Sequence, residues 1–152
     1  MNRKPLYVVY VDWACFFMSI VKEIQFEVEW RLEVPINVSQ VIAELHREVT
    51  GEYETAHGMS DPFRIDTGTG QGCVNGASRA KIFLAVVQRM VGRTGAGYTI
   101  TQGGEGANGV RVPQVVYADD MGLMTESLAG AQMVLDASAM VAILCGMNIK
   151  VK

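Results

Sequence analysis

Three aspartates stand at the ends of strongly apolar stretches of this sequence. Asp12 follows residues 6–11, and Asp119 and Asp120 follow residues 115–117. A carboxylate placed against buried apolar sequence is unfavourable unless it is paired or binds a metal ion. No lysine or arginine adjoins these acids in the sequence, so three carboxylates brought together would need divalent cations to offset their repulsion. Two Mg²⁺ ions about 3.5–4 Å apart, for which Mn²⁺ can substitute, would meet that need and support phosphoryl transfer.

The same acids have simpler interpretations, which the residues alone leave open. Aspartate is common in turns, so the pair Asp119-Asp120 could belong to an ordinary hairpin turn. Asp12 could instead cap a helix that begins after it. The catalytic interpretation requires that the strands ending at these acids are neighbours in one sheet, because only then do the carboxylates meet.

Short runs rich in β-branched and aromatic residues predict the strands. Residues 6–11 are expected to form a strand buried on both faces, and residues 115–124 a hairpin with the paired acids at or near its turn. Residues 98–112 are Gly-rich and polar, which predicts a hairpin or loop. A strand pair is expected within residues 51–67, with its turn at 59–62, and a last strand at 147–151.

Apolar residues at helical spacing predict the helices. Residues 20–32 and 38–49 each carry an apolar stripe, and a long apolar helix over residues 78–91 follows a glycine cluster. A further amphipathic helix is expected over residues 128–144. This order of elements predicts one α+β domain, with helices packed on one face of a mostly antiparallel sheet.

The composition is that of a globular chain with few charges. Hydrophobic residues make up 49% and charged residues 19% of the 152 residues, and the net charge is −3. The 13 lysines and arginines are scattered, whereas an independent nucleic-acid binder usually has a basic surplus or stripe. Cys15, Cys73 and Cys145 have no zinc-ligand spacing, and no apolar run is long enough for a membrane span. We therefore expect an intracellular protein, nuclear or cytoplasmic, with no membrane segment.

Four motifs of this chain resemble those of reverse transcriptases, in the order in which that family has them. They are Tyr10-Val11-Asp12, Gly68-Thr69-Gly70-Gln71-Gly72, Tyr117-Ala118-Asp119-Asp120 and Gly146-Met147-Asn148-Ile149. The third is similar to the family's Tyr-x-Asp-Asp box and is the most specific. A segment at residues 60–63 also resembles a strand of non-LTR retrotransposon polymerases. The resemblance covers nearly all of residues 1–152 and implies a polymerase palm with a ferredoxin-like, split βαβ arrangement.

The resemblance implies a metal site built on the acids. Asp12 and Asp119 would be the principal ligands of two Mg²⁺ ions, with Asp120 as a third acid beside them. A backbone carbonyl of Val11 or Trp13 is a further candidate ligand.

It also implies contacts with nucleotide and template. Phe17 would lie under the sugar of the incoming dNTP, although a core position suits this ring equally well. Gln71 and Gly72 would contact the template and the nucleotide. Tyr117 of the Tyr-x-Asp-Asp box would also belong to this nucleotide- and template-binding set. Lys152 would be a proton donor or a phosphate contact.

The implied activity is RNA-directed DNA synthesis, in which a dNTP is added to a primer 3′-hydroxyl on an RNA or DNA template. We see no fingers segment before Asp12 and no thumb after Lys152, so we expect these parts elsewhere in the same polyprotein and an isolated chain that is inactive. Met18 stands where non-LTR members usually have an acid, and the residues after Gly72 also depart from the family pattern. The alternatives are an inactive retroelement remnant and a non-catalytic α+β binding module.

Overall fold

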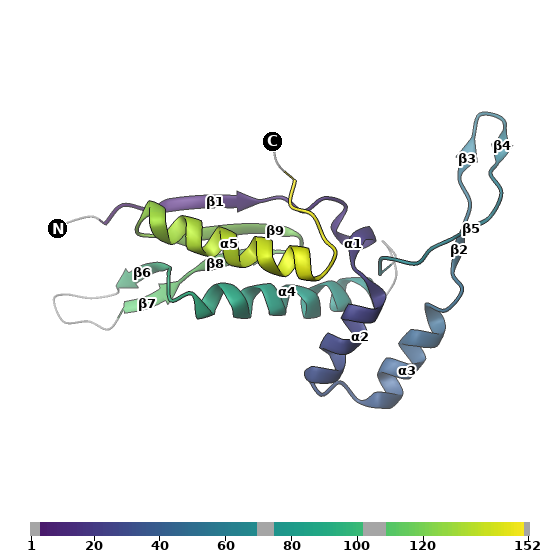
Figure 1. Cartoon of the computed structure of the whole chain (residues 1–152), viewed down its shortest axis with the longest axis horizontal. Coiled ribbons are helices and arrows are strands. Elements are labelled where there is room, and N and C mark those ends of the chain that lie inside the picture. Colours follow the sequence, from purple (N-terminus) through teal and green to yellow (C-terminus); the bar gives the residue numbers. More distant parts are fainter. Residues whose placement is uncertain (1–3, 70–74, 102–108, 151–152) are drawn as a thin grey trace.

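The computed structural model describes residues 4–69, 75–101 and 109–150 of the chain (Figure 1). The fold is α+β, as predicted, and its strands pair in antiparallel fashion. The described residues form five helices: α1 (Phe16–Ser19), α2 (Lys22–Arg31), α3 (Ile36–Leu45), α4 (Gly76–Arg93) and α5 (Leu128–Leu144). None of the helices in this part of the chain is long and apolar enough to cross a bilayer.

A three-stranded antiparallel sheet forms the centre of the body. Its strands, in spatial order, are β1 (Tyr7–Val11), β9 (Asp120–Thr125) and β8 (Gln114–Tyr117). Two-stranded pairings join β2 (Thr50–Gly51) to β5 (Phe63–Arg64), β3 (Glu54–Thr55) to β4 (Gly58–Met59), and β6 (Tyr98–Thr101) to β7 (Gly109–Val112). The hairpins predicted within residues 98–112 and 115–124 are therefore confirmed.

One face of the central sheet is covered by α4 and α5, which run side by side along it (Figure 1). The core lies between these two layers and is built from Val11, Met121, Leu123, Phe83, Val87 and Val134, all of which are buried. Burial of one such side chain contributes about 1.5–3 kcal/mol. This layer stabilises the two strands that carry the acids.

The other face of the sheet is open, which corrects the prediction that residues 6–11 are buried on both faces. Side chains alternate between the two faces of a strand. Val11 points into the core, whereas the side chains of Val8 and Tyr10 are exposed, Tyr10 to 85%. A continuous β-branched and aromatic run does not reveal whether one or both faces have neighbours, and here one face has none among the described residues.

An arm made of α3 and the strands β2–β5 extends away from the body (Figure 1). Its hairpin turns at Ala56-His57, between β3 and β4, and not at residues 59–62 as predicted. Gly58 explains the shift, because its φ of 116° suits glycine and places the tight turn before Met59. Helix α3 is amphipathic as predicted, but it ends at Leu45 and has no buried residue.

Helices α2 and α4 are joined by a buried ion pair. Arg79 Nε donates to Glu29 Oε1 over 3.0 Å, and each residue is only 1% exposed. The guanidinium carbon of Arg79 also lies 4.9 Å from the centre of the Phe26 ring. The pair links residues 50 positions apart and determines where α2 crosses α4.

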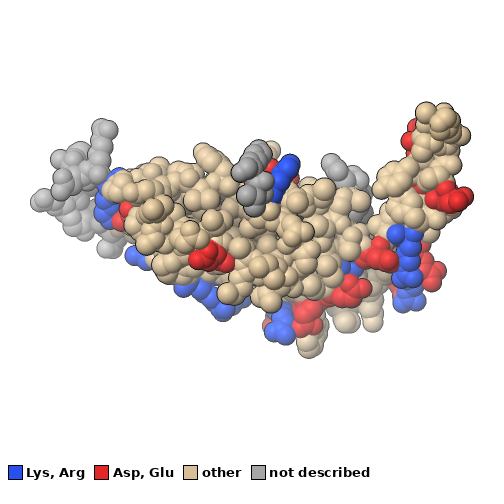
Figure 2. Space-filling view, turned by 45° about the horizontal axis from the view of Figure 1, so that its top comes forward, with Lys and Arg blue, Asp and Glu red and all other residues tan. Residues whose placement is uncertain are grey.

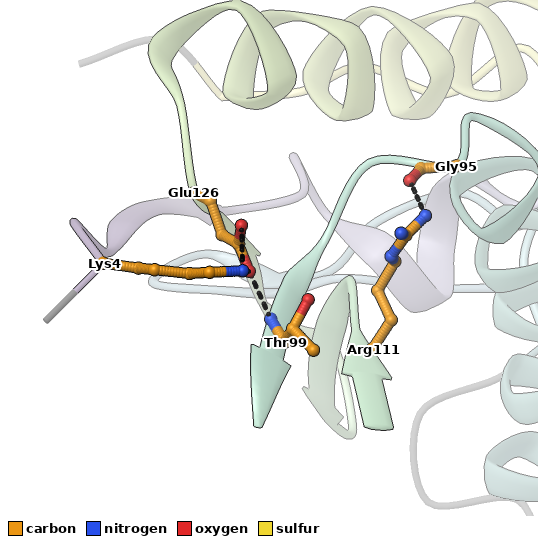
Figure 3. A network of polar contacts seen from close by, with 5 residues as sticks. All are labelled: Lys4, Gly95, Thr99, Arg111 and Glu126. Carbon is orange, nitrogen blue, oxygen red and sulfur yellow. Dashed lines mark hydrogen bonds and ion pairs between the residues drawn. The ribbon is translucent and has the colours of Figure 1, made fainter. Parts of the chain in front are cut away.

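A second polar network joins three segments at the opposite end of the body (Figure 3). Lys4 Nζ donates to both carboxylate oxygens of Glu126, over 3.1 and 2.9 Å, and the backbone N–H of Thr99 donates to the same carboxylate over 3.0 Å. The Lys4 hydrogen bond, assisted by Thr99, lowers the pKa of Glu126 from 4.5 to about 2. Arg111 donates to the carbonyl of Gly95 beside it. The network attaches β6 and the N-terminal segment to the end of β9.

Candidate functional site

The sheet topology brings the predicted acids to one end of the central sheet. β1 and β9 are antiparallel neighbours, and Val11 is paired with Met121. Continuation of this register by one residue sets Asp12 opposite Asp120. On the other side of β9, Tyr117 pairs with Asp120, so Ala118 and Asp119 form the two-residue turn of the β8–β9 hairpin. The condition for the acids to meet, adjacent strands in one sheet, is fulfilled.

The turn between β8 and β9 has a strained backbone. Ala118 has a φ of 53°, in the left-handed region that residues with a Cβ rarely adopt. Such a conformation costs on the order of 1–3 kcal/mol and is concentrated at functional sites. Alanine occupies this position, although glycine or asparagine would adopt the conformation at a lower cost in free energy. The two-residue length of the turn holds Asp119 beside the end of β9.

Asp12 and Asp120 both face the open side of the sheet. They line a shallow depression of about 640 Å³, whose other walls include Tyr10, Val115 and Tyr117. The rings of Tyr10 and Tyr117 are 85% and 83% exposed, so two aromatic surfaces stand next to the acids. Asp119 is half-buried in the turn and does not line this depression.

A lysine that the sequence did not single out lies next to Asp12. The Nζ atom of Lys150 is 3.6 Å from Asp12 Oδ2, and the backbone N–H of Lys150 donates to the Asp12 carbonyl over 2.7 Å. The chain returns here after α5, and Ile149 forms a β-bridge with Trp13. The last strand predicted at 147–151 is thus, within its described residues, an isolated bridge. Because both side chains are about half exposed, the ion pair itself contributes little to stability.

The carboxylates are brought together only in part. Across residues 4–69, 75–101 and 109–150, no three His, Cys, Asp or Glu side chains form a group that could hold a metal ion. Two aspartates on one open face do fit Mg²⁺ in their chemistry, since this ion takes one or two carboxylates and completes its shell with water and phosphate oxygens. Two-metal binding by Asp12, Asp119 and Asp120 therefore stays a prediction.

The residues around Asp12 are packed into the core. Trp13 and Val11 are buried, and Phe17 is half-buried, with its ring edge-on to Phe16 at a centroid distance of 5.4 Å. Asp12 does not cap a helix, because the residue that precedes α1 is Cys15, whose side chain makes no capping hydrogen bond. The packing of Phe17 agrees with the core position that the sequence left open for it. Its contact with the sugar of a dNTP stays a prediction.

The start of the glycine cluster lies against α1. The Thr69 N–H donates to the Phe17 carbonyl over 2.9 Å, and the Gly68 N–H donates to the Ile20 carbonyl over 2.8 Å. Gly68 has a φ of 90°, and a Cβ there would lie 2.9 Å from the Phe17 carbonyl oxygen. Glycine is thus required at this contact. The second motif thus begins beside the segment that holds Phe17, which follows the first motif in the sequence.

Three of the predicted nucleotide and template contacts fall outside the described residues: Gln71, Gly72 and Lys152. Their roles stay predictions. Among the described residues, Lys150 is the cation beside Asp12.

No protein-family model matches this chain, and no curated protein sequence matches it.

Proposed function

We propose that this chain is the palm domain of a reverse transcriptase-like polymerase, which adds dNTPs to a primer 3′-hydroxyl along an RNA or DNA template. The observation that supports the proposal most strongly is the pairing of β1 with β9, which sets Asp12 and Asp120 on one open face. The Tyr-Ala-Asp-Asp sequence forms the adjoining two-residue turn. In a non-catalytic binding module, nothing would require acids from separate parts of the sequence to lie together on one face of the sheet.

In this proposal the acids hold two Mg²⁺ ions, with Asp12 and Asp120 on the open face and Asp119 contributed from the turn. When bound, the ions stabilise the attacking and leaving oxygens of phosphoryl transfer. The chain itself supplies position, because a packed core fixes both strands behind the acids. The exposed rings of Tyr10 and Tyr117 offer surfaces on which bases or sugars can stack. Lys150 offers a positive charge close to where a phosphate would lie.

Titration of the full chain with Mn²⁺, followed by calorimetry, tests this proposal. The wild-type chain should bind Mn²⁺, and Asp12→Asn and Asp120→Asn should each raise the Kd at least about tenfold, equivalent to about 1.4 kcal/mol. The matched control is Asp136→Asn, which removes an exposed acid on α5 and should leave the Kd unchanged. A dNTP titration should then show binding that depends on Mn²⁺. Equal Mn²⁺ affinity in all four folded proteins would refute the assignment of these acids.

One observation favours a second candidate, an inactive retroelement remnant with the same fold. Lys150 already pairs with Asp12, and the described carboxylates do not form a three-acid group. A remnant would fold normally and fail to bind Mn²⁺ at Asp12. The variant Lys150→Met separates the candidates, because its removal of a competing cation should tighten Mn²⁺ binding in a working site and have no effect in a remnant.

A further inference from the structure

A groove with a basic rim lies between α2 and α4 and shares no lining residue with the depression at the candidate site. It encloses about 670 Å³. Its floor is apolar and consists of Val28, Leu32, Val86 and Met90, and its rim carries Arg31, Arg89 and Arg93. In Figure 2 lysine and arginine side chains follow the lower left edge of the molecule, and farther right along this edge acidic side chains lie among them.

The positive charge of the three arginines in this groove is only partly neutralised by neighbouring acidic side chains. Arg31 pairs with Glu27 over 2.6 Å. Within the part of the chain that the structure describes, Arg89 and Arg93 form no ion pair. Arg31 and Arg93 stand in the last turns of their helices, where the helix dipole favours a cation. Arg89 lies one turn earlier and has no such explanation.

A buried ion pair between α2 and α4 supports the shape of the groove. Glu29 follows Val28 on α2, and its buried pair with Arg79 joins α2 to α4. A partner would therefore meet preformed walls, which lowers the cost of binding.

We propose that this groove binds an acidic amphipathic helix of a partner protein. An apolar stripe at i, i+3, i+4 and i+7 would fill the floor, and carboxylates beside that stripe would meet the three arginines. The apolar floor distinguishes this occupant from a nucleic acid, because phosphates would neutralise the rim and leave Leu32, which is 46% exposed, uncovered. None of the described residues that line the groove has an aromatic ring on which a base could stack.

A second copy of this chain is a poorer occupant. Of the described helices outside the groove, α1 has no acidic residue, and α3 and α5 carry one each, Glu44 and Asp136. Glu44 already pairs with Arg47 over 2.7 Å, and Asp136 accepts a hydrogen bond from Gln132. Neither helix presents the row of free carboxylates that three arginines would attract.

The test uses a fluorescein-labelled synthetic helix with leucines at i, i+3, i+4 and i+7 and glutamates on both sides of them. Its binding to the full chain is measured by fluorescence anisotropy, against a peptide with lysine at each glutamate position. The acidic peptide should bind saturably, and the lysine peptide should not. The double variant Arg89→Glu/Arg93→Glu should raise the Kd roughly tenfold or more. Added salt should weaken binding, since the contacts are charged.

Lys81→Glu is the matched control, because Lys81 is exposed on α4 and does not line the groove. It should bind the acidic peptide as the wild type does, and circular dichroism should show that all variants are folded. Three results would each overturn the proposal: no saturable binding of the acidic peptide, equal binding of the lysine peptide, or tighter binding of a single-stranded oligonucleotide that the arginine reversals abolish.

Discussion

Replacement of Glu29 by leucine would leave the Arg79 guanidinium buried without its acidic partner. Both side chains are almost fully enclosed between α2 and α4, and Arg79 Nε lies 3.0 Å from Glu29 Oε1. The two Nη atoms of Arg79 have no hydrogen-bond partner among the described residues, so only the Phe26 ring would remain to offset the loss of the carboxylate. The charge would then have to stay in an apolar environment or pull the helices apart.

The expected cost is large relative to the stability of a small domain. Removal of one member of a buried ion pair costs about 3–5 kcal/mol, against a total of about 5–15 kcal/mol for folding. At roughly 2–4 °C per kcal/mol for a chain of this size, the Tm should fall by about 6–20 °C. The double variant Glu29→Leu/Arg79→Met should recover most of this loss, because it removes both charges and keeps similar volume.

Urea unfolding of the single and double variants, followed by circular dichroism, measures these differences. Glu27→Gln is the matched control on the same helix, since Glu27 pairs with Arg31 at the surface over 2.6 Å and should cost no more than about 1 kcal/mol. A Glu29→Leu variant within about 1 kcal/mol of the wild type would mean that Arg79 is solvated, and would refute the reasoning from burial.

Three further predictions concern other parts of the fold. Because folding lowers the pKa of Glu126 from 4.5 to about 2, its carboxylate contributes stability that is complete above pH 4.5 and is lost as the pH falls towards 2. The wild-type Tm should therefore drop more steeply than that of Glu126→Gln over this pH range, and parallel curves would contradict the Lys4 pairing. Gly68→Ala should lower the free energy of unfolding by about 1–3 kcal/mol, because its Cβ would meet the Phe17 carbonyl at a φ of 90°; an unchanged urea midpoint would argue against that contact. Ser127→Ala should cost about 1 kcal/mol in the same assay, because its hydroxyl caps the first turn of α5, and no loss would show that the cap is not formed.

Local signals in the sequence were sufficient for several elements. Helix α5 begins and ends at the predicted residues, because Ser127 caps its start and Gly146, with a φ of 69°, follows its end. The β8–β9 hairpin was predictable because two apolar runs flank the Asp119-Asp120 pair. These features depend on neighbours in the sequence, which are visible without the fold.

Features that depend on distant neighbours could not be predicted. The spacing on α2 suggested an apolar stripe, yet Glu29 is buried because Arg79 lies across from it. Tyr10 is exposed because the described chain places no layer over that side of the sheet. Lys150 reaches Asp12 only because the chain doubles back after α5. The scattered arginines gather in one groove for the same reason, since α2 and α4 meet only in the folded protein.

Paramagnetic line broadening by Mn²⁺ in a ¹H–¹⁵N NMR spectrum tests the proposed polymerase site most directly, because it locates a bound ion residue by residue. The proposal predicts that substoichiometric Mn²⁺ first broadens the amides around Asp12 and those around Ala118 to Met121, and that Asp120→Asn removes this effect. Broadening that is confined to the acidic arm around Glu52 and Glu54, or that is the same in the variant, would contradict it.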